Sequence, residues 1–412
     1  MEELCYWVWL SQCFAYGSET PRKLLEIYPS PKTLYEMDEE ERRSIDFLKP
    51  RELRALERTP LSQALQIEKE CSRYKIQIIP MNDPVYPKRL RHIYGPPVVL
   101  YALGNLDGLD EEVAIAVVGT RDADKYALAA TEYLAGGIAK AGGIIVSGCA
   151  VGVDTAAHKA AVAAGKRTIA VLACGLDVNY PAENAKLKHQ ILRTGGALLS
   201  ECPPGAQVFP KIFPIRNRLI SGLSLGVLIT QAPLRSGALL TAGHAVEQGK
   251  ELFCLPPYSI FDPSYAGVIR YLRDGAVPVF APEDVLYPFY AVYPEKIDLS
   301  VLSGDAAEQK AVLGTLEQAS STKQHGKQEF KKNTSVGSGN FEKAQKNPET
   351  MFDELHGLVY NQLDIHPKSI DELAIACSLD VGTLFSVLTD LELDGVVVPL
   401  GGGRYIKAEK TQ

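Results

Sequence analysis

Six short apolar runs in the middle of the chain constrain its fold more than any other feature. Within each run, apolar residues follow one another instead of alternating with polar ones, and segments of helix length separate the runs. A strand of this kind must be covered on both faces, which is typical of a parallel sheet with helices on either side. The sequence therefore predicts an α/β, doubly wound parallel sheet. Its strands are expected at residues 113–119, 143–147, 168–173, 196–200, 225–230 and 251–256.

The loops at the carboxyl edge of this sheet hold the first candidate site residues, because doubly wound sheets bind ligands beyond the carboxyl ends of their strands. Glycines in such loops let a ligand approach the backbone, and the free N–H groups at a helix start suit an anion. Hydroxyl and guanidinium groups add further hydrogen-bond donors. The candidates in these loops are Gly119, Arg121, Ser147, Gly148, Ser236, Gly237 and Thr241.

A second group of polar residues lies inside an apolar segment, "FPIRNRLISGLS" at 213–224. A packed interior would exclude two permanent cations and an amide, whereas a guanidinium offers a planar set of donors that suits phosphate oxygens. We interpret the segment as a binding surface, with the candidates Arg216, Asn217, Arg218 and Ser221. Arg167, directly before the third strand, adds a cation that we expect at or close to the same end of the sheet.

The charge of the chain is unevenly distributed. The net charge of −7 argues weakly against nucleic-acid binding, but residues 113–280 contain 16 Lys and Arg against 11 Asp and Glu. The middle of the chain is therefore basic within an acidic protein. Cations spread over several loops would follow a chain of phosphates, whereas a mononucleotide needs a single cradle.

Several other functional classes lack their motifs. The sequence has no GxxxxGK[ST] phosphate loop, no nucleophile elbow and no Cys and His spacing typical of zinc sites. The eight cysteines are scattered without CxxC spacing, so we expect no metal site and a location in the reducing cytoplasm. We also expect no cofactor. Neither a secretory signal nor an apolar stretch of about twenty residues is present, so no membrane span is expected.

We place the central domain at residues 79–302. The sequence on either side of it predicts a helical domain, a linker and a C-terminal domain. Apolar residues in 1–78 recur at three- and four-residue spacing, which indicates a helical domain. The charged run at 38–43, "DEEERR", is interpreted as a solvated helix face. Residues 303–350 are polar, with a basic centre, and predict a flexible linker.

The C-terminal region, residues 351–412, predicts a winged helix. Helices are expected over 352–363, from a capping box of Ser369 and Glu372, and over 381–393, followed by a hairpin. The third of these helices contains no Lys or Arg, and it carries carboxylates that would repel phosphates. We therefore favour protein docking or regulation over DNA reading for this domain. The carboxylates are Asp390, Glu392 and Asp394.

Two residues of the segment "SGCAVGVDTAAH" allow more than one interpretation. Asp154 is more simply explained as the N-cap of the following helix than as a ligand-binding carboxylate. His158, one turn later, fits a buried helix histidine better than a catalytic base.

The motifs together resemble a known family. The segments "VSGCAVGVDTAAH", "GLDVNYPAENAKL", "FPIRNRLISGLS" and "SGALLTAGHAVEQGKELFCLP" follow one another in the order and spacing of the bacterial DNA-processing protein A (DprA/Smf) family. The resemblance is specific over about residues 80–280 and looser at both ends, where the family has a SAM-like helical domain and a winged helix.

This resemblance implies an extended Rossmann fold that binds single-stranded DNA without ATP and is not an enzyme. It implies a homodimer formed through the Rossmann domain, which loads RecA recombinase onto strands covered by single-strand binding protein during natural transformation. By motif position, the DNA-binding residues of the family fall on Arg121, Arg167, the triad Arg216, Asn217 and Arg218, and the loops at Ser147-Gly148 and Ser236-Gly237.

The sequence departs from the family pattern at three places. Val151 stands where the family usually has a cation, and Gln231 stands where it has an acidic residue. The loop after Pro257 lacks the usual "GxN". We expect the missing charge to weaken DNA affinity and the changed loop to alter the last part of the pocket.

Two other functions remain open from the sequence. One is a nucleotide-processing enzyme similar to phosphoribohydrolases, although no carboxylate follows the turn "PLRSGALLTA" before Glu247. The other is a nucleotide-sensing scaffold whose function lies in the winged helix.

Overall fold

The computed structural model describes residues 3–302, 354–363, 368–377, 379, 381–393, 396–400 and 404–407. They belong to two compact units divided between Lys323 and Gln324. The linker predicted at 303–350 lies outside the described residues, as do Asp394 and the first residues of the predicted helix over 352–363.

A nine-stranded sheet forms the centre of the first unit, in the order β1-β2-β6-β5-β4-β3-β7-β8-β9. In this sheet β2 runs antiparallel to both of its neighbours, β1 and β6, and β3 to β9 run parallel. The six expected strands are confirmed as β3 to β8, whereas β1, β2 and β9 were not predicted. The strands are β1 (Gln77–Pro80), β2 (Val99–Gly104), β3 (Ala114–Val118), β4 (Ile144–Ser147), β5 (Thr168–Leu172), β6 (Ala197–Ser200), β7 (Gly226–Ile229), β8 (Glu251–Cys254) and β9 (Val277–Pro278).

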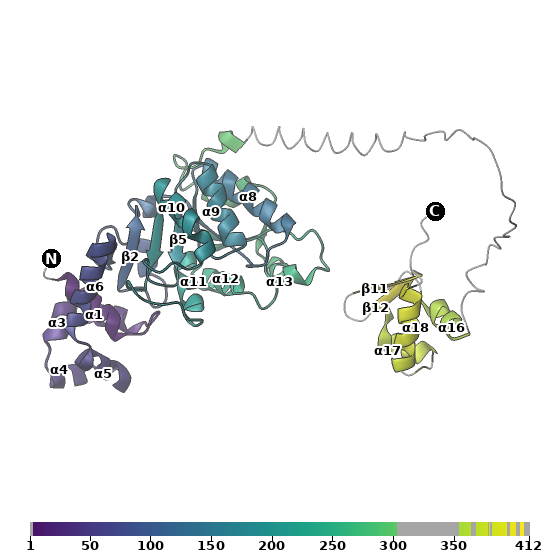
Figure 1. Cartoon of the computed structure of the whole chain (residues 1–412), viewed down its shortest axis with the longest axis horizontal. Coiled ribbons are helices and arrows are strands. Elements are labelled where there is room, and N and C mark those ends of the chain that lie inside the picture. The colour runs from purple at the N-terminus through teal and green to yellow at the C-terminus, as the bar shows by residue number, and fades with distance from the viewer. Residues whose placement is uncertain are drawn as a thin grey trace, which may run out of the picture. The chain divides into compact units, whose positions relative to one another are not determined.

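Helices cover both faces of the sheet, which explains why its strands are apolar throughout. Ala116 of β3 belongs to a core with Leu219 and Ile220 of the helix on one face. The next residue, Val117, belongs to a core with Leu134 and other residues on the opposite face. Figure 1 shows α8 and α9 on one side of the sheet and α11 and α12 on the other. The predicted doubly wound fold is confirmed. These helices are α8 (Lys125–Lys140), α9 (Val153–Ala163), α11 (Ile212–Leu223) and α12 (Ala238–Glu247).

The remaining helices of this part connect or flank the strands. They are α7 (Lys88–Arg91), η1 (Leu109–Glu111), η2 (Ala182–Asn184), α10 (Ala185–Arg193), η3 (Pro263–Tyr265), α13 (Ala266–Arg273), α14 (Pro282–Tyr290) and η4 (Leu299–Leu302).

The strand order reverses beside β3. From β3 the chain proceeds outward through β4, β5 and β6, and it then returns to the other side of β3 to build β7, β8 and β9. The loops after β3 and β7 therefore diverge over opposite faces and leave a crevice at the carboxyl edge, which is where doubly wound sheets bind ligands.

Six helices precede the sheet and pack against its β1 and β2 edge. Trp9 and Leu10 share a core with Val99 and Tyr101 of β2, so the helices and the sheet belong to one unit. The boundary that we predict after residue 78 falls inside β1, and the domain limits remain predictions. The helices are α1 (Leu4–Cys13), α2 (Thr20–Ile27), α3 (Pro31–Glu36), α4 (Glu39–Arg43), α5 (Pro50–Arg58) and α6 (Leu61–Tyr74).

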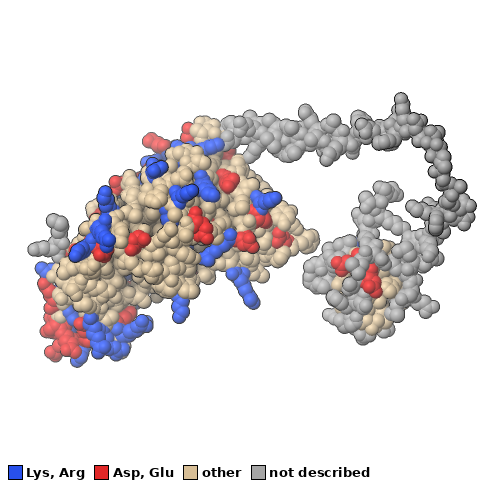
Figure 2. All heavy atoms as spheres, viewed as in Figure 1, with Lys and Arg blue, Asp and Glu red and all other residues tan. Residues whose placement is uncertain are grey.

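The charged run at 38–43 forms a solvated helix, as expected. No residue of α4 is buried, and Asp38 accepts a hydrogen bond from the N–H of Glu41 as its N-cap. Figure 2 shows red and blue side chains gathered at this end of the first unit.

The second unit has the order of elements that we predict for a winged helix. Ser369 and Glu372 form the predicted capping box, with a hydrogen bond of 2.8 Å from the Ser369 N–H to the Glu372 carboxylate. Its sheet has the order β10-β12-β11. The elements are α16 (Glu354–Gln362), β10 (Lys368–Ser369), α17 (Ile370–Cys377), α18 (Val381–Leu393), β11 (Val397–Leu400) and β12 (Arg404–Lys407).

Within the described ranges, none of the helices combines the length and apolar character needed to cross a membrane. All eight cysteines are buried.

Candidate nucleic-acid interface

A groove of about 330 Å³ occupies the crevice beside β3. Its walls come from the loops after β3, β4 and β7 and from one side of α11, which are far apart in the sequence. The structure therefore brings together most of the candidates from the sequence analysis. Those that line the groove are Gly119, Arg121, Arg216, Asn217, Ser236, Gly237 and Thr241.

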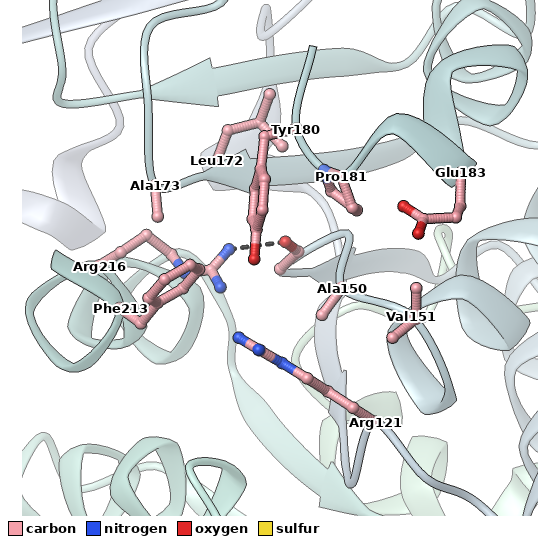
Figure 3. A pocket seen from close by; sticks show the side chains of 11 residues that line it. Arg121, Ala150, Val151, Leu172, Ala173, Tyr180, Pro181, Glu183, Phe213 and Arg216 are labelled. Carbon is pink, nitrogen blue, oxygen red and sulfur yellow. Dashed lines mark hydrogen bonds between the residues drawn. The ribbon is translucent and has the colours of Figure 1, made fainter. Parts of the chain in front are cut away.

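A smaller cavity of about 160 Å³ adjoins the groove and shares Arg121, Phe213 and Arg216 with it. Gly148, another candidate, lines this cavity together with Tyr180. Figure 3 shows Arg121 and Arg216 extending toward the same space from opposite sides, with Tyr180 and Phe213 beside them. Two cations and two aromatic rings thus surround one cavity.

Arg216 is held in place by backbone carbonyls. Its side chain is buried, and its Nη1 atom donates hydrogen bonds to the carbonyl oxygens of Gly148, at 2.7 Å, and Val171. A Cβ atom on residue 148 would lie 2.6 Å from the guanidinium, so only glycine fits there. Burial lowers the pKa of Arg216, and the nearby carboxylate of Asp154 partly offsets this effect. Arg216 is therefore a fixed charge at the floor of the site.

Asp154 does not cap a helix, contrary to the simpler interpretation. The N-cap of α9 is Gly152, and Asp154 lies in its first turn. Its carboxylate accepts hydrogen bonds from the N–H groups of Gly148, at 3.1 Å, and Ala150, at 3.3 Å. Asp154 therefore shapes the loop that faces Arg216.

Arg121 and Arg235 are the exposed cations of the groove. The Arg121 guanidinium lies 5.1 Å from the centroid of the Phe213 ring, and neither arginine has an ion-pair partner within the part of the chain that the structure describes. Arg235 was not among the candidate site residues, although it stands in the same turn as Ser236, Gly237 and Thr241. Its position in the loop after β7, beside the candidates Ser236 and Gly237, could have revealed it.

The polar residues near Arg235 support the loop after β7. The Asn217 side chain donates a hydrogen bond of 3.1 Å to the Gly237 carbonyl oxygen, and the Ser236 hydroxyl accepts one of 3.2 Å from the Ala238 N–H. Helix α12 begins at Ala238 on the groove wall. The positive end of its helix dipole therefore lies at the groove and favours an anion there.

Arg218 does not reach the groove, so its expected position is wrong. Because helical side chains two residues apart point in different directions, Arg218 lies away from Arg216 and pairs with Glu201 at 2.5 Å. Both side chains are nearly buried. The Cβ position of Gly17, from the helical region, lies 3.2 Å from the Arg218 Nε atom. Arg218 therefore lies between the N-terminal helical region and Glu201, the residue that follows β6.

Three further candidates are not in the groove. Ser147 is fully buried, and its hydroxyl donates to the Val117 carbonyl oxygen at 2.7 Å. Ser221 is also buried and donates to the Arg218 carbonyl oxygen at 3.2 Å. Arg167 precedes β5, whereas the groove follows the strand ends. In a parallel sheet these are opposite edges, so the expectation that Arg167 shares the rim is wrong.

The structure shows where the three departures from the family pattern lie. Val151 lines the smaller cavity and is exposed. Gln231 is buried, and its amide donates hydrogen bonds of 2.8 Å to both Asp124 and Ser264. The loop after Pro257 exposes Tyr258 and two apolar neighbours.

His158 is buried, as the simpler interpretation predicts. Its Nδ1 atom lies 2.8 Å from the Thr168 hydroxyl oxygen, and burial lowers its pKa to about 3. A histidine that stays neutral and buried at ordinary pH does not serve as a base for a ligand in the groove.

Comparison with known proteins agrees with this architecture. A family model described as DNA recombination-mediator protein A matches residues 77–289. A model of the DprA winged helix domain matches residues 342–403.

Individual relatives extend this match. DNA processing protein DprA of Bacillus subtilis is 41% identical over 215 residues, which cover 51% of this chain and 70% of that protein. Protein Smf of Synechocystis is 32% identical over 338 residues, which cover 80% of this chain and 79% of that protein. The X-ray structure of DprA from Streptococcus pneumoniae has a TM-score of 0.59 and 32% identity, covering 68% of this chain and 95% of that one. The chain therefore belongs to the DNA recombination-mediator protein A (DprA) family.

Proposed function

We propose that the groove binds single-stranded DNA and that the protein mediates recombination through this binding. The observation that carries the proposal is the convergence of Arg121, Arg216 and Arg235, from three distant segments, on one groove. Membership of a family of DNA recombination mediators supports it.

The depth of the site favours an unpaired strand. Arg216 lies at the floor and is only 6% exposed, so the phosphates of a stiff duplex could not approach it. A single strand can bend into the groove and place phosphates near the two exposed arginines. Its unstacked bases can then contact Phe213 and Tyr180, since aromatic side chains bind bases by stacking.

Catalysis has little support in the groove. Asp154 is the one carboxylate among the described residues that line it, and two backbone N–H groups hold this side chain. A phosphoribohydrolase-like reaction would need a glutamate close after the turn at the start of α12, whereas the first carboxylate there, Glu247, lies at the end of that helix. We infer a binding protein rather than an enzyme. Release of adenine from AMP by the purified protein would contradict this inference.

The finer role follows the family resemblance. We propose that the protein acts as a cytoplasmic homodimer, that it loads RecA onto strands covered by single-strand binding protein, and that it serves natural transformation. For the second unit we propose protein docking. Its helix α18 has no Lys or Arg and exposes Asp390 and Glu392, so this helix would repel DNA phosphates.

DNA binding is tested by fluorescence anisotropy with labelled oligothymidine and unlabelled competitors. We expect single strands to compete far better than duplexes of the same length, and the Arg121→Ala, Arg235→Ala double variant to bind weakly. Equal competition by duplex, or wild-type affinity in the double variant, would contradict the proposal.

RecA loading is tested separately, by the lag in RecA ATP hydrolysis on DNA covered by single-strand binding protein. The protein should shorten the lag, and the double variant should not. Light scattering on the same preparations tests the dimer.

A further inference from the structure

Exposed aromatic and apolar side chains cluster on the loop that follows β8. Tyr258, Ile260 and Phe261 expose 61%, 72% and 73% of their surface. Isolated apolar residues on a surface are ordinary, but several large ones together mark a surface that binds something. We name Tyr258 and Phe261 of this loop, together with Tyr126, whose ring lies beside that of Tyr258, the aromatic platform.

Hydrogen bonds fix two rings of the platform. The Tyr126 hydroxyl donates to the Pro256 carbonyl oxygen at 2.9 Å, and the Tyr258 hydroxyl donates to the Asp262 carboxylate at 2.5 Å. The two ring centroids are 5.8 Å apart in an edge-to-face arrangement. The ring centroid of Tyr265 lies 6.3 Å from that of Tyr126 and 5.7 Å from that of Tyr258. Rings fixed before binding lose little conformational entropy when a flat partner stacks on them.

The platform adjoins the groove. The loop after β8 neighbours the loop after β7 because these strands are adjacent in the sheet. Gln231 links the groove to the platform. Its carbonyl oxygen accepts a hydrogen bond of 2.8 Å from the Thr120 N–H on the groove wall. Its side chain accepts from the Asp124 N–H and donates to Ser264, at the base of the platform. Groove and platform therefore share one hydrogen-bonded support.

The charges around the platform differ from those in the groove. Lys125 is exposed beside Tyr126, but Asp122 is exposed nearby and Asp262 holds Tyr258. The balance is close to neutral, which gives phosphates little attraction. The exposed groups suit the uncharged faces of bases, which stack on aromatic rings independently of sequence.

We propose that the aromatic platform stacks bases of the DNA strand where the strand leaves the groove. This proposal rests on the proposed function and extends it with a second subsite of different chemistry: the groove binds phosphates, and the platform binds bases. The alternative occupant is a second copy of this chain, which the test separates.

The test compares full-length wild type with Phe261→Ala, using oligothymidine and an oligonucleotide of equal length in which the bases are removed at one end. Alanine replacement of a stacking ring costs about 1–3 kcal/mol per base, so the variant should bind oligothymidine about 5- to 150-fold more weakly. It should bind the partly abasic strand as the wild type does. Its salt dependence should equal that of the wild type, because no cation is lost.

Two variants serve as controls. Tyr258→Phe keeps the ring and should retain binding. Tyr74→Ala removes an exposed ring at the end of α6, next to β1 at the other edge of the sheet, and should also bind normally.

Each result decides between the alternatives. If wild type binds DNA with salt dependence but Phe261→Ala binds equally well, the platform proposal is overturned and the groove stands. If Phe261→Ala changes the oligomeric state by light scattering and leaves binding to the two oligonucleotides unaltered, the platform is an interface between copies. If wild type shows no salt-dependent binding, both the proposed function and the platform fail.

Discussion

Helix α11 and the loops after β3 and β7 use arginine in different ways. Arg216 and Arg218 of α11 are buried and bound to protein groups, namely backbone carbonyls and Glu201. Arg121 and Arg235 of the two loops are exposed and line the groove. The helix has the denser cluster of charge in the sequence, but the loops hold the cations that are available to a ligand.

The two groups of arginines therefore have different roles: those of α11 stabilise the fold, and those of the loops are available to a ligand. A guanidinium that already donates to buried oxygens cannot leave them without a large loss of stability. An exposed guanidinium exchanges water and counterions for phosphate oxygens at little cost to the fold. Substitution in α11 should therefore act on stability first, and substitution in the loops should act on DNA affinity alone.

Replacement of Arg218 is expected to have the largest effect, a loss in the free energy of unfolding. The Arg218→Ala variant leaves the Glu201 carboxylate buried without its partner, which costs about 3–5 kcal/mol in the free energy of unfolding. Urea denaturation followed by circular dichroism measures this loss. Arg235→Ala is the matched control, because it removes an exposed arginine and should leave stability unchanged. A stable Arg218→Ala variant with lost DNA affinity would reverse the assignment of Arg218.

The Gly148→Ala variant tests the position of Arg216. The added methyl group would lie 2.6 Å from the guanidinium, so Arg216 must move, at a cost of up to about 3 kcal/mol. We expect lower stability and weaker DNA binding together. Gly243→Ala, in α12 and outside the groove lining, provides the control, since its methyl group would meet no atom within 4 Å. Equal effects of the two substitutions would show that Arg216 is not held as described.

The buried His158 should make the free energy of unfolding depend on pH. Its pKa is about 3 in the folded protein, whereas an unfolded histidine has a pKa of about 6.5. The unfolded state therefore binds more protons between these values, and stability falls as pH falls below about 6.5. The loss should reach about 2 kcal/mol at pH 5. Urea unfolding at pH 7 and pH 5 measures it, and His158→Gln should remove this part of the pH dependence. An unchanged pH dependence in that variant would contradict the assignment.

The sequence predicts the fold well because each central strand is a continuous apolar run. Two of the missed strands lack this signal: β9 has only two residues, and β1 continues directly from the helical region that ends in α6. The third, β2, is a continuous apolar run that was passed over, because it stands before the repeating pattern of strands and helices. Continuous burial identifies strands only where helices cover both faces.

The candidate site is predicted less completely, for a geometric reason. Position after a strand correctly places Arg121 and Gly237 at the groove. Charge within a motif does not show which way a side chain points, so Arg218 was grouped with Arg216 although the two lie on different sides of α11. Whether a hydroxyl such as that of Ser147 is already bonded inside the sheet depends on its neighbours in space, which one sequence does not reveal.

The central claim is that Arg121 and Arg235 contact phosphates of a single strand, and the salt dependence of binding tests it most directly. Each phosphate contact on a single strand contributes about 0.7 to the negative slope of log affinity against log salt concentration. The Arg121→Ala, Arg235→Ala variant should therefore have a slope about 1.4 smaller in magnitude than the wild type. Arg167→Ala, at the opposite edge of the sheet, should keep the wild-type slope. An unchanged slope in the double variant, or an equal reduction in Arg167→Ala, would contradict the account.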